Sequence, residues 1–311
     1  MTWSRLSDTL VGIPLKTPVI IASGVWPYDA DLWDKNNLDG VGAICTKAVS
    51  NKSRRGNTGV RVWETSCGLL NSIGLQNTGV HDFLQNALPV IRKGGMPFFV
   101  NVVMESIEET QETLKALAEH DDIIKGVELN ISCPNVDGDG MVWGVSPEST
   151  AQAVAASRSV WQGSLLVKLT PQCHDPYGVA LAAEASGADG LVVANTWLGM
   201  AIDINQCRPV FNRTFAGFSG PAVFPLALRL VWQVCEATSL PVIGCGGIST
   251  WQDALSMILA GASAIELGTA MFLHSDMPRS ICKGLDAYLE GHKIDHIREL
   301  RGRAQARKGV F

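Results

Sequence analysis

The stretch LLVKLTPQCHDPYGVALAAEASGADGLVVANT, residues 165–196, contains the repeating unit from which the fold can be inferred. Two short apolar runs, at 165–169 and 190–194, flank an alanine-rich stretch with helical character at 176–186. Neither run alternates between apolar and polar residues, which is typical of strands buried on both faces in a parallel sheet. The stretch therefore predicts a strand, a helix and a second strand parallel to the first.

The same unit recurs along the rest of the chain. We expect eight strands, at residues 18–22, 42–46, 97–103, 126–131, 165–169, 190–194, 241–244 and 264–267. We expect helices between several of them, at 107–119, 147–161, 176–186, 222–238 and 250–260. Because no break in composition separates the units, they predict one α/β domain over residues 1–311, closed as a (β/α)8 TIM barrel. An open doubly wound sheet is the alternative, because a strand count from sequence can be wrong by one or two.

Composition and charge exclude several classes of partner. Hydrophobic residues make up 46% of the chain and charged residues 18%, which suffices for a large buried core. The net charge of −5, with no basic cluster longer than residues 52–55, argues against nucleic acid, because neutralising phosphates needs a concentrated positive face. The longest apolar stretch, 179–201, is broken by Glu184 and Asp189, so no membrane span is expected.

The cysteines indicate a compartment. Eight are spread along the chain without a C-x-x-C pair, and the N-terminus carries no secretory signal. This pattern predicts a cytoplasmic protein with mostly free, buried thiols and no metal site built by this chain alone.

Polar residues or glycines follow all eight expected strands, at the end of a barrel where active sites lie. Gly246-Gly247 and Gly268-Thr269 come after the seventh and eighth strands, where backbone N–H groups can approach an anion closely. One such turn could serve chain reversal alone, but two in succession favour a phosphate-bearing cofactor. Since no G-x-G-x-x-G pattern occurs, a dinucleotide bound by this chain is not expected.

Cys133 is the candidate acid/base. It follows the fourth expected strand, between Ser132 and Pro134, and a loop rich in glycine and aspartate comes next, at 136–144. A thiol can release a proton and take it back, and a glycine-rich loop suits a lid that excludes water. A free cysteine is more often a small buried apolar residue, and we interpret the other seven cysteines in that way.

Two lysines and several amides indicate the ligand. Lys47 and Lys168 end apolar strands, and a buried lysine needs a partner, so an anionic ligand is the simplest explanation. Lys168 could instead form a Schiff base, as in barrel aldolases. The loop at 71–77 and the pair Asn195-Thr196 offer amide donors and acceptors, which suit a pyrimidine ring.

These residues together resemble the class 1 dihydroorotate dehydrogenases over almost the whole chain. The resemblance is carried by Ala22-Ser-Gly24, Lys47, Asn71-Ser-Ile-Gly-Leu-Gln-Asn77, Asn130-Ile-Ser-Cys-Pro-Asn135, Val167-Lys-Leu169, Asn195-Thr196, Ser219-Gly-Pro-Ala222, Gly246-Gly-Ile248 and Gly268-Thr269. The segments 71–77 and 130–135 are the most specific of these.

The resemblance implies an FMN-binding barrel that oxidises (S)-dihydroorotate to orotate in de novo pyrimidine (UMP) biosynthesis. The flavin ring and ribityl chain would contact Ser23, Lys47, Ala48, Asn101, Asn130, Lys168, Ala194 and Gly220, and the phosphate Gly246, Gly247, Gly268 and Thr269. Substrate would contact Lys47, Asn71, Ser72, Ile73, Gly74, Leu75, Asn130, Asn195 and Thr196. The catalytic residues would be Cys133, Lys47 and Lys168: Cys133 takes the C5 proton as hydride passes from C6 to flavin N5, and Lys168 stabilises charge on the reduced ring.

The residues in these motifs are more similar to those of the NAD-linked class 1B type than to those of the fumarate-linked class 1A homodimer. It implies a homodimer with a second subunit that carries FAD and a 2Fe–2S cluster and passes electrons to NAD. A dihydropyrimidine dehydrogenase-like reductase, a Schiff-base lyase and a catalytically silent binding scaffold stay open as alternatives.

Overall fold

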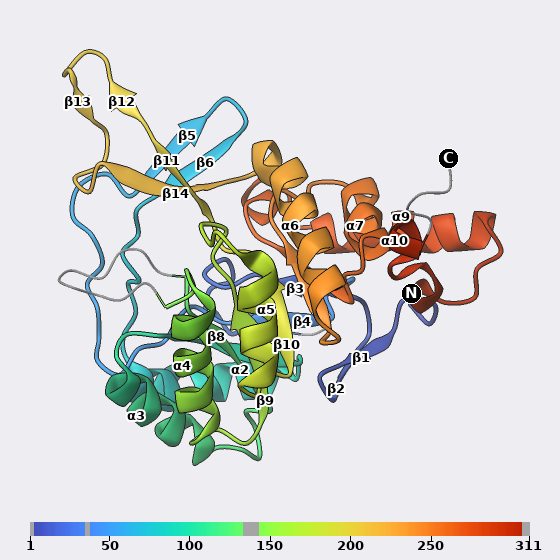
Figure 1. Ribbon diagram of the computed structural model, residues 1–311, viewed down its shortest axis with the longest axis horizontal. Helices are drawn as coiled ribbons and strands as arrows, with labels where there is room; N and C mark the ends of the chain where they lie inside the picture. The colour runs from blue at the N-terminus through green and yellow to red at the C-terminus, as the bar shows by residue number, and fades with distance from the viewer. Residues whose placement is uncertain (1–2, 35–37, 133–142, 307–311) are drawn as a thin grey trace.

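Eight parallel strands close into a barrel in the computed structural model, which describes residues 3–34, 38–132 and 143–306 (Figure 1). The strands are β3 (Val19–Ile21), β4 (Ala43–Cys45), β7 (Phe98–Val103), β8 (Gly126–Asn130), β9 (Ser164–Lys168), β10 (Gly190–Val193), β15 (Val242–Cys245) and β16 (Ala264–Leu267). They follow one another around the barrel in chain order, and β16 pairs with β3 to close it. The predicted TIM barrel is confirmed, and each of its strands overlaps one of the expected runs.

Helices cover the outside of the barrel (Figure 1). The longer ones are α3 (Ile107–Ala118), α4 (Pro147–Arg158), α5 (Pro176–Ala185), α6 (Phe224–Ala237), α7 (Trp251–Leu259) and α9 (Met277–Gly291). Shorter ones are α1 (Val80–Asp82), α2 (Leu88–Gly94), α8 (Ala270–Leu273) and α10 (Arg303–Ala306), with a π-helical turn at Phe83–Ala87 and 3-10 turns at Pro221–Val223 and Ile297–Leu300. Side chains of Ser106, Ser146, Asp175 and Thr250 cap the starts of α3, α4, α5 and α7 by accepting a backbone N–H of the first turn. Among the described residues, none of the helices combines the length and the apolar character that crossing a bilayer would demand.

A hairpin of β1 (Asp8–Leu10) and β2 (Ile13–Leu15) belongs to the apolar filling of the barrel interior. Two strand-start glycines lie against it: a Cβ at Gly126 would lie 3.3 Å from Ile13 and one at Gly190 would lie 3.2 Å from Val11, although Phe99 and Leu166 of the barrel would be nearer still. Since Gly126 and Gly190 begin their strands, the hairpin fills the N-terminal end of the barrel and leaves the opposite end for ligands.

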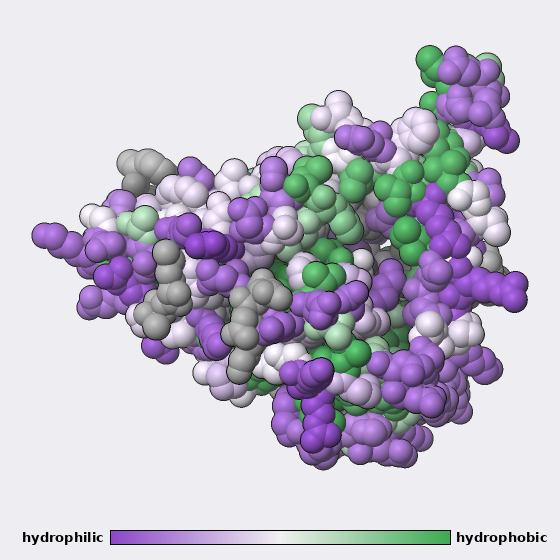
Figure 2. All heavy atoms as spheres, turned by 180° about the vertical axis from the view of Figure 1, so that it is seen from behind, coloured by the Kyte–Doolittle hydropathy of each residue, from purple (hydrophilic) through white to green (hydrophobic). Residues whose placement is uncertain are grey.

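A second, antiparallel sheet projects from the barrel and was not expected from the sequence (Figure 1, upper left). Its strands are, in order, β11 (Trp197–Met200), β14 (Phe215–Ser219), β6 (Gly68–Asn71) and β5 (Val62–Thr65), with β12 (Ile202–Asp203) and β13 (Arg208–Pro209) forming a separate hairpin. Figure 2 shows apolar side chains along this projecting arm, and the exposed ones include Val62, Leu198, Met200, Ile202 and Phe215.

The turns of these hairpins correct the expectation for two cysteines. Cys67 links β5 to β6, Cys207 links β12 to β13, and both side chains are exposed. The interpretation of these two as buried apolar residues was wrong, because the hairpins that carry them stand away from the core. Cys45, Cys245 and Cys282 are buried as expected, and Cys173 and Cys235 are half-buried.

Candidate active site

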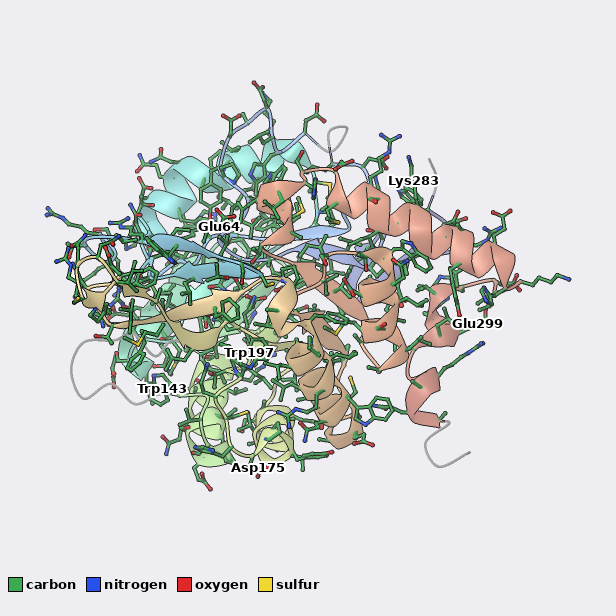
Figure 3. All side chains as sticks on the ribbon, turned by 90° about the horizontal axis from the view of Figure 1, so that it is seen from above. Glu64, Trp143, Asp175, Trp197, Lys283 and Glu299 are labelled. Carbon is green, nitrogen blue, oxygen red and sulfur yellow. The ribbon has the colours of Figure 1, made fainter. Side chains whose placement is uncertain are left out.

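A cavity of about 920 Å³ opens at the C-terminal ends of the barrel strands. Its wall includes residues that end or directly follow β3, β8, β9, β10, β15 and β16, and residues of the projecting sheet. Trp197 at the start of β11 is one of these, and it lies near the middle of the molecule when seen from above (Figure 3). The cavity is at the large end of the range for small-molecule sites and at the end of the barrel where such sites form.

The cavity collects nearly all of the site residues expected from the sequence. Its lining includes Ser23, Lys47, Ala48, Asn71, Ile73, Gly74, Leu75, Asn130, Lys168, Ala194, Asn195, Thr196, Gly220, Gly246, Gly247, Gly268 and Thr269. Asn101 and Ser72 do not line it: Asn101 is fully buried in the barrel below, and Ser72 accepts a hydrogen bond from Asn57. Cys133 and most of the glycine-rich loop after it lie outside the described residues.

The glycine turns after β15 and β16 form a phosphate cradle, which is a set of four backbone N–H groups. The backbone N–H groups of Gly246, Gly247, Gly268 and Thr269 donate no hydrogen bond to any part of the chain that the structure describes. Gly247 has φ +74, and a Cβ there would lie 2.5 Å from the backbone nitrogen of Phe224, so only glycine fits. Free N–H groups that face a cavity at these two strand ends suit a phosphate.

Lys47 supplies a positive charge to the cavity. It follows β4, is half-buried and forms no ion pair with a described residue. Its Nζ lies 3.3 Å from where a Cβ on Gly24 would stand, and partial burial lowers the pKa of its ammonium. An anionic ligand, which was also predicted from the sequence, would offset this desolvation.

Lys168 is deeper than expected. It lines the cavity but is only 3% exposed, and its Nζ donates to Glu266 Oε2 at 2.7 Å and to Glu128 Oε1 at 3.2 Å. Burial alone would lower the pKa of Lys168, but the charges of Glu128 and Glu266 raise it well above its usual value. A Schiff-base nucleophile must be a neutral amine, so this arrangement removes the basis of the lyase alternative.

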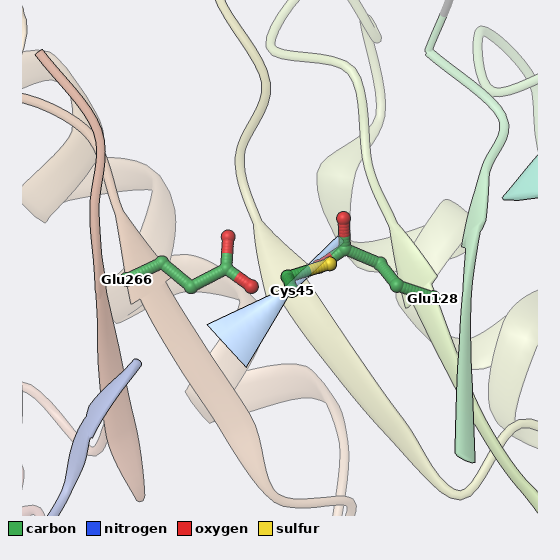
Figure 4. A group of neighbouring side chains, drawn as sticks. All are labelled: Cys45, Glu128 and Glu266. Atoms are coloured by element: carbon green, nitrogen blue, oxygen red, sulfur yellow. The ribbon is translucent and has the colours of Figure 1, made fainter. Parts of the chain in front are cut away.

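The two carboxylates were missed, although the sequence carried a signal for them. Glu128 and Glu266 each interrupt an otherwise apolar strand, Gly126–Asn130 and Ala264–Leu267, and such strands rarely bury an unpaired charge. They lie on opposite sides of the barrel, and Figure 4 shows them pointing toward one another with Cys45 between them.

A hydrogen-bond network joins Asn130, Ser132 and Asn195, and Ser132 directly precedes Cys133 in the sequence. Asn130 Oδ1 accepts from Ser132 Oγ at 2.6 Å, from Ser132 N at 3.2 Å and from Asn195 Nδ2 at 3.4 Å. Because its carbonyl oxygen is used, the Asn130 amide offers only N–H donors to a ligand. Asn71 is turned the other way: its Nδ2 donates to the Gly217 carbonyl at 3.4 Å, which leaves its oxygen to accept.

The projecting sheet adds lining residues that were not among the predicted site residues. Trp197 pairs with Phe218 across β11 and β14, and both line the cavity beside Ser219, whose Oγ accepts from Thr269 Oγ1 at 2.8 Å. Gln172 also lines it. Of these added lining residues only Ser219 belongs to a motif quoted from the sequence, and the pairing of β6 with β14 brings together residues 146 to 150 positions apart.

Comparison with known proteins agrees with this geometry. A family model described as dihydroorotate dehydrogenase matches residues 5–289. Proteins named dihydroorotate dehydrogenase B (NAD(+)), catalytic subunit, are similar over nearly the full length of both chains. The protein from Alkaliphilus metalliredigens is 40% identical over 97% of this chain and 99% of its own length. The protein from Geotalea uraniireducens is 42% identical over 96% and 97%, and that from Porphyromonas gingivalis is 40% identical over 94% of each.

Proposed function

The chain belongs to the dihydroorotate dehydrogenase family, and we propose that it oxidises (S)-dihydroorotate to orotate in the de novo synthesis of UMP. The observation that carries the proposal is one cavity that joins a phosphate cradle, an unpaired lysine and oriented amides. The dihydropyrimidine reductase alternative fits less well, because its ligand has no carboxylate to pair with Lys47.

FMN is the cofactor that the cavity suits. Four free N–H groups, of Gly246, Gly247, Gly268 and Thr269, would hold its phosphate, and Ser23, Ala48, Asn130, Lys168, Ala194 and Gly220 line the space for the rest. When bound, FMN supplies a hydride acceptor for C6 of the substrate and a route for electrons to leave. Residues 1–311 would then constitute a single FMN-binding domain.

The chain's own residues account for binding and for the proton. Lys47 would pair with the substrate carboxylate, the N–H donors of Asn130 would meet a ring carbonyl, and the free oxygen of Asn71 would accept a ring N–H. We assign Cys133, which lies outside the described residues, as the base that takes the C5 proton. Asn195 and Thr196, with Ser72 to Leu75, would complete the substrate pocket.

The relatives' names support the NAD-linked class 1B type over the fumarate-linked type. They are called catalytic subunits and carry NAD(+) in their names. We therefore propose that this chain forms a homodimer that works with a partner subunit in the cytoplasm, and that FAD and a 2Fe–2S cluster on the partner pass electrons to NAD.

An anaerobic visible spectrum tests the proposal. The purified chain is expected to be yellow, and its flavin band to bleach when dihydroorotate is added. Re-oxidation by NAD only after addition of the partner subunit would support the 1B type, whereas re-oxidation by fumarate alone would support 1A. A yellow chain that ignores dihydroorotate but responds to dihydrouracil would favour the reductase, and a chain that cannot be loaded with FMN would refute the proposal.

Replacing Gly247 with alanine tests the phosphate cradle. The added Cβ must contact the Phe224 backbone at a positive φ, so the turn has to shift and misplace its N–H groups. We expect FMN to dissociate from Gly247→Ala at least about tenfold more readily, a loss of about 1.4 kcal/mol, in a fluorescence titration of the flavin-free chain.

Gly95→Ala is the matched control. Gly95 has a similar φ of +69 at the end of α2, but a Cβ there meets nothing within 4 Å. Gly95→Ala therefore carries the cost of alanine at a positive φ without the steric conflict. If both variants bound FMN with equal affinity, Gly247 would have no part in a phosphate cradle.

A further inference from the structure

One ammonium and two carboxylates are enclosed together in the middle of the barrel. The side chain of Glu128 is 0% exposed and that of Glu266 is 1% exposed, and both are bound to Lys168. Two buried negative charges against one positive charge leave the group with a net charge of −1. An uncompensated charge in a protein interior is costly, so something must neutralise it.

The surrounding side chains do not supply a second positive charge. Asn101 from β7 is a neutral amide, and burial raises the pKa of the Cys45 thiol from β4 and of the Cys245 thiol from β15, so both stay protonated. The inward residues of the two other strands, Ile20 and Val192, are apolar. Within the described chain, Lys168 is the only cation that acts on either carboxylate.

The hydrogen bonds also lack a donor. Glu128 Oε1 accepts from Asn101 Nδ2 at 2.5 Å and from Lys168, but no donor among the described residues reaches Glu128 Oε2, which is fully buried. A carboxylate oxygen of Glu128, one of Glu266 and the Cys45 sulfur all lie within 4.8 Å of one another (Figure 4). A proton on one carboxyl group would give the other the donor it lacks.

We propose that Glu128 and Glu266 share one proton and act as positioning residues, which hold the Lys168 ammonium as a fixed positive charge in the floor of the cavity. This proton makes the group of Lys168, Glu128 and Glu266 neutral, and it also gives Glu128 Oε2 a hydrogen-bond donor. Lys168 and Glu266 line the cavity, whereas Glu128 does not, so one carboxyl group holds the lysine from the cavity wall and the other from the barrel interior.

The consequence for chemistry rests on the proposed function. A lysine held between two carboxyl groups cannot swing toward substrate or lose its proton, so it presents a constant charge to a flavin above it. Fixed charge of this kind stabilises negative charge that develops on a bound ring without further reorganisation.

Infrared spectroscopy of the full chain tests the shared proton without needing flavin. At pH 7 the wild type is expected to show the C=O stretch of a buried carboxylic acid that shifts in D2O. Glu128→Gln and Glu266→Gln should each lose this band, because one carboxylate then faces one ammonium and needs no proton. Glu64→Gln, which replaces an exposed glutamate on β5, should keep it. A wild type without the band, as when a buried water bridges two ionised carboxylates, would overturn the proposal.

The pH dependence of unfolding gives a second readout. Burial and the charge of Glu128 raise the pKa of Glu266 from 4.5 to about 8, so between these values the folded chain holds a proton that the unfolded chain has released. The stability from this proton is complete below pH 4.5 and is lost as the pH rises through 8. Relative to Glu266→Gln, the wild-type unfolding equilibrium constant should therefore rise about tenfold per pH unit in that window. A ratio that does not change with pH would overturn the proposal.

The flavin-loaded chain tests the positioning role. Above pH 8 the wild-type group gains a negative charge that Glu266→Gln cannot gain, so the midpoint potential of the flavin should fall with pH more steeply in the wild type. Parallel pH profiles would refute the positioning role. A chain that binds no flavin would defeat the proposed function but leave the infrared and unfolding tests intact.

Discussion

Cys133→Ala is expected to slow the reduction of bound flavin by dihydroorotate about 10²–10⁴-fold at neutral pH, while the flavin itself stays bound. The thiol is assigned to take the C5 proton, and alanine leaves no group in its place that can do so. None of the residues assigned to the phosphate cradle changes, so the yellow colour should persist. Anaerobic stopped-flow absorbance, which follows the flavin band after mixing with dihydroorotate, measures the rate directly.

Cys207→Ser controls for the loss of a thiol elsewhere. Cys207 is exposed in the turn between β12 and β13, away from the cavity lining, and its replacement should leave the rate unchanged. Cys133→Ser separates geometry from acidity, because serine replaces the thiol with a hydroxyl of similar size that releases its proton less readily. If Cys133→Ala reduced its flavin at the wild-type rate, Cys133 would have no part in the reaction.

The sequence predicted the barrel well because its signal is local. Each strand, such as 126–130 or 164–168, is a short apolar run that can be recognised without knowing its partner. The projecting sheet was missed because β6 and β14 pair across 146 to 150 positions of the chain, and because its strands carry glycines such as Gly199 and Gly217 among their apolar residues. Their pairing, rather than their composition, makes them strands.

The candidate site divides in the same way. Residues that end a strand, such as Lys47 and Asn130, could be placed at the mouth of the barrel because all parallel strands end there. Glu128 and Glu266 could not be placed, because their role depends on both meeting Lys168 inside a closed barrel, from strands 138 positions apart in the chain. The sequence of each strand predicts which side chains point inward, but only the closure of the barrel determines which of these side chains come into contact.

Removing the Lys168 charge is expected to have the largest effect on stability. Lys168→Met leaves Glu128 and Glu266 buried without their cation, and breaking a buried ion pair from one side typically costs about 3–5 kcal/mol. Urea unfolding of the flavin-free chain at pH 7, followed by circular dichroism, measures this loss. The triple variant with Glu128→Gln and Glu266→Gln should recover part of it, because no charge then remains in the barrel interior.

The loss should also depend on pH, with a sign set by the two carboxyl groups. Without the ammonium, the desolvation that raises the pKa of both carboxyl groups loses its main opposing charge, so we expect the folded variant to keep protons that the unfolded chain releases. Stability linked to such groups is present below pH 4.5 and falls as the pH rises, so the penalty should be small in acid and grow toward neutrality.

Lys47→Met is the matched comparison, because both lysines line the cavity at the end of a strand and differ in their partners. Lys47 has no ion pair in the described structure, and its ammonium is partly desolvated, so methionine should cost little stability or none. It should instead raise the KM for dihydroorotate, since its proposed partner is the substrate carboxylate. A Lys168→Met chain as stable as Lys47→Met at pH 7 would mean that the buried carboxylates do not need the lysine, and the charge balance inferred for the barrel would be wrong.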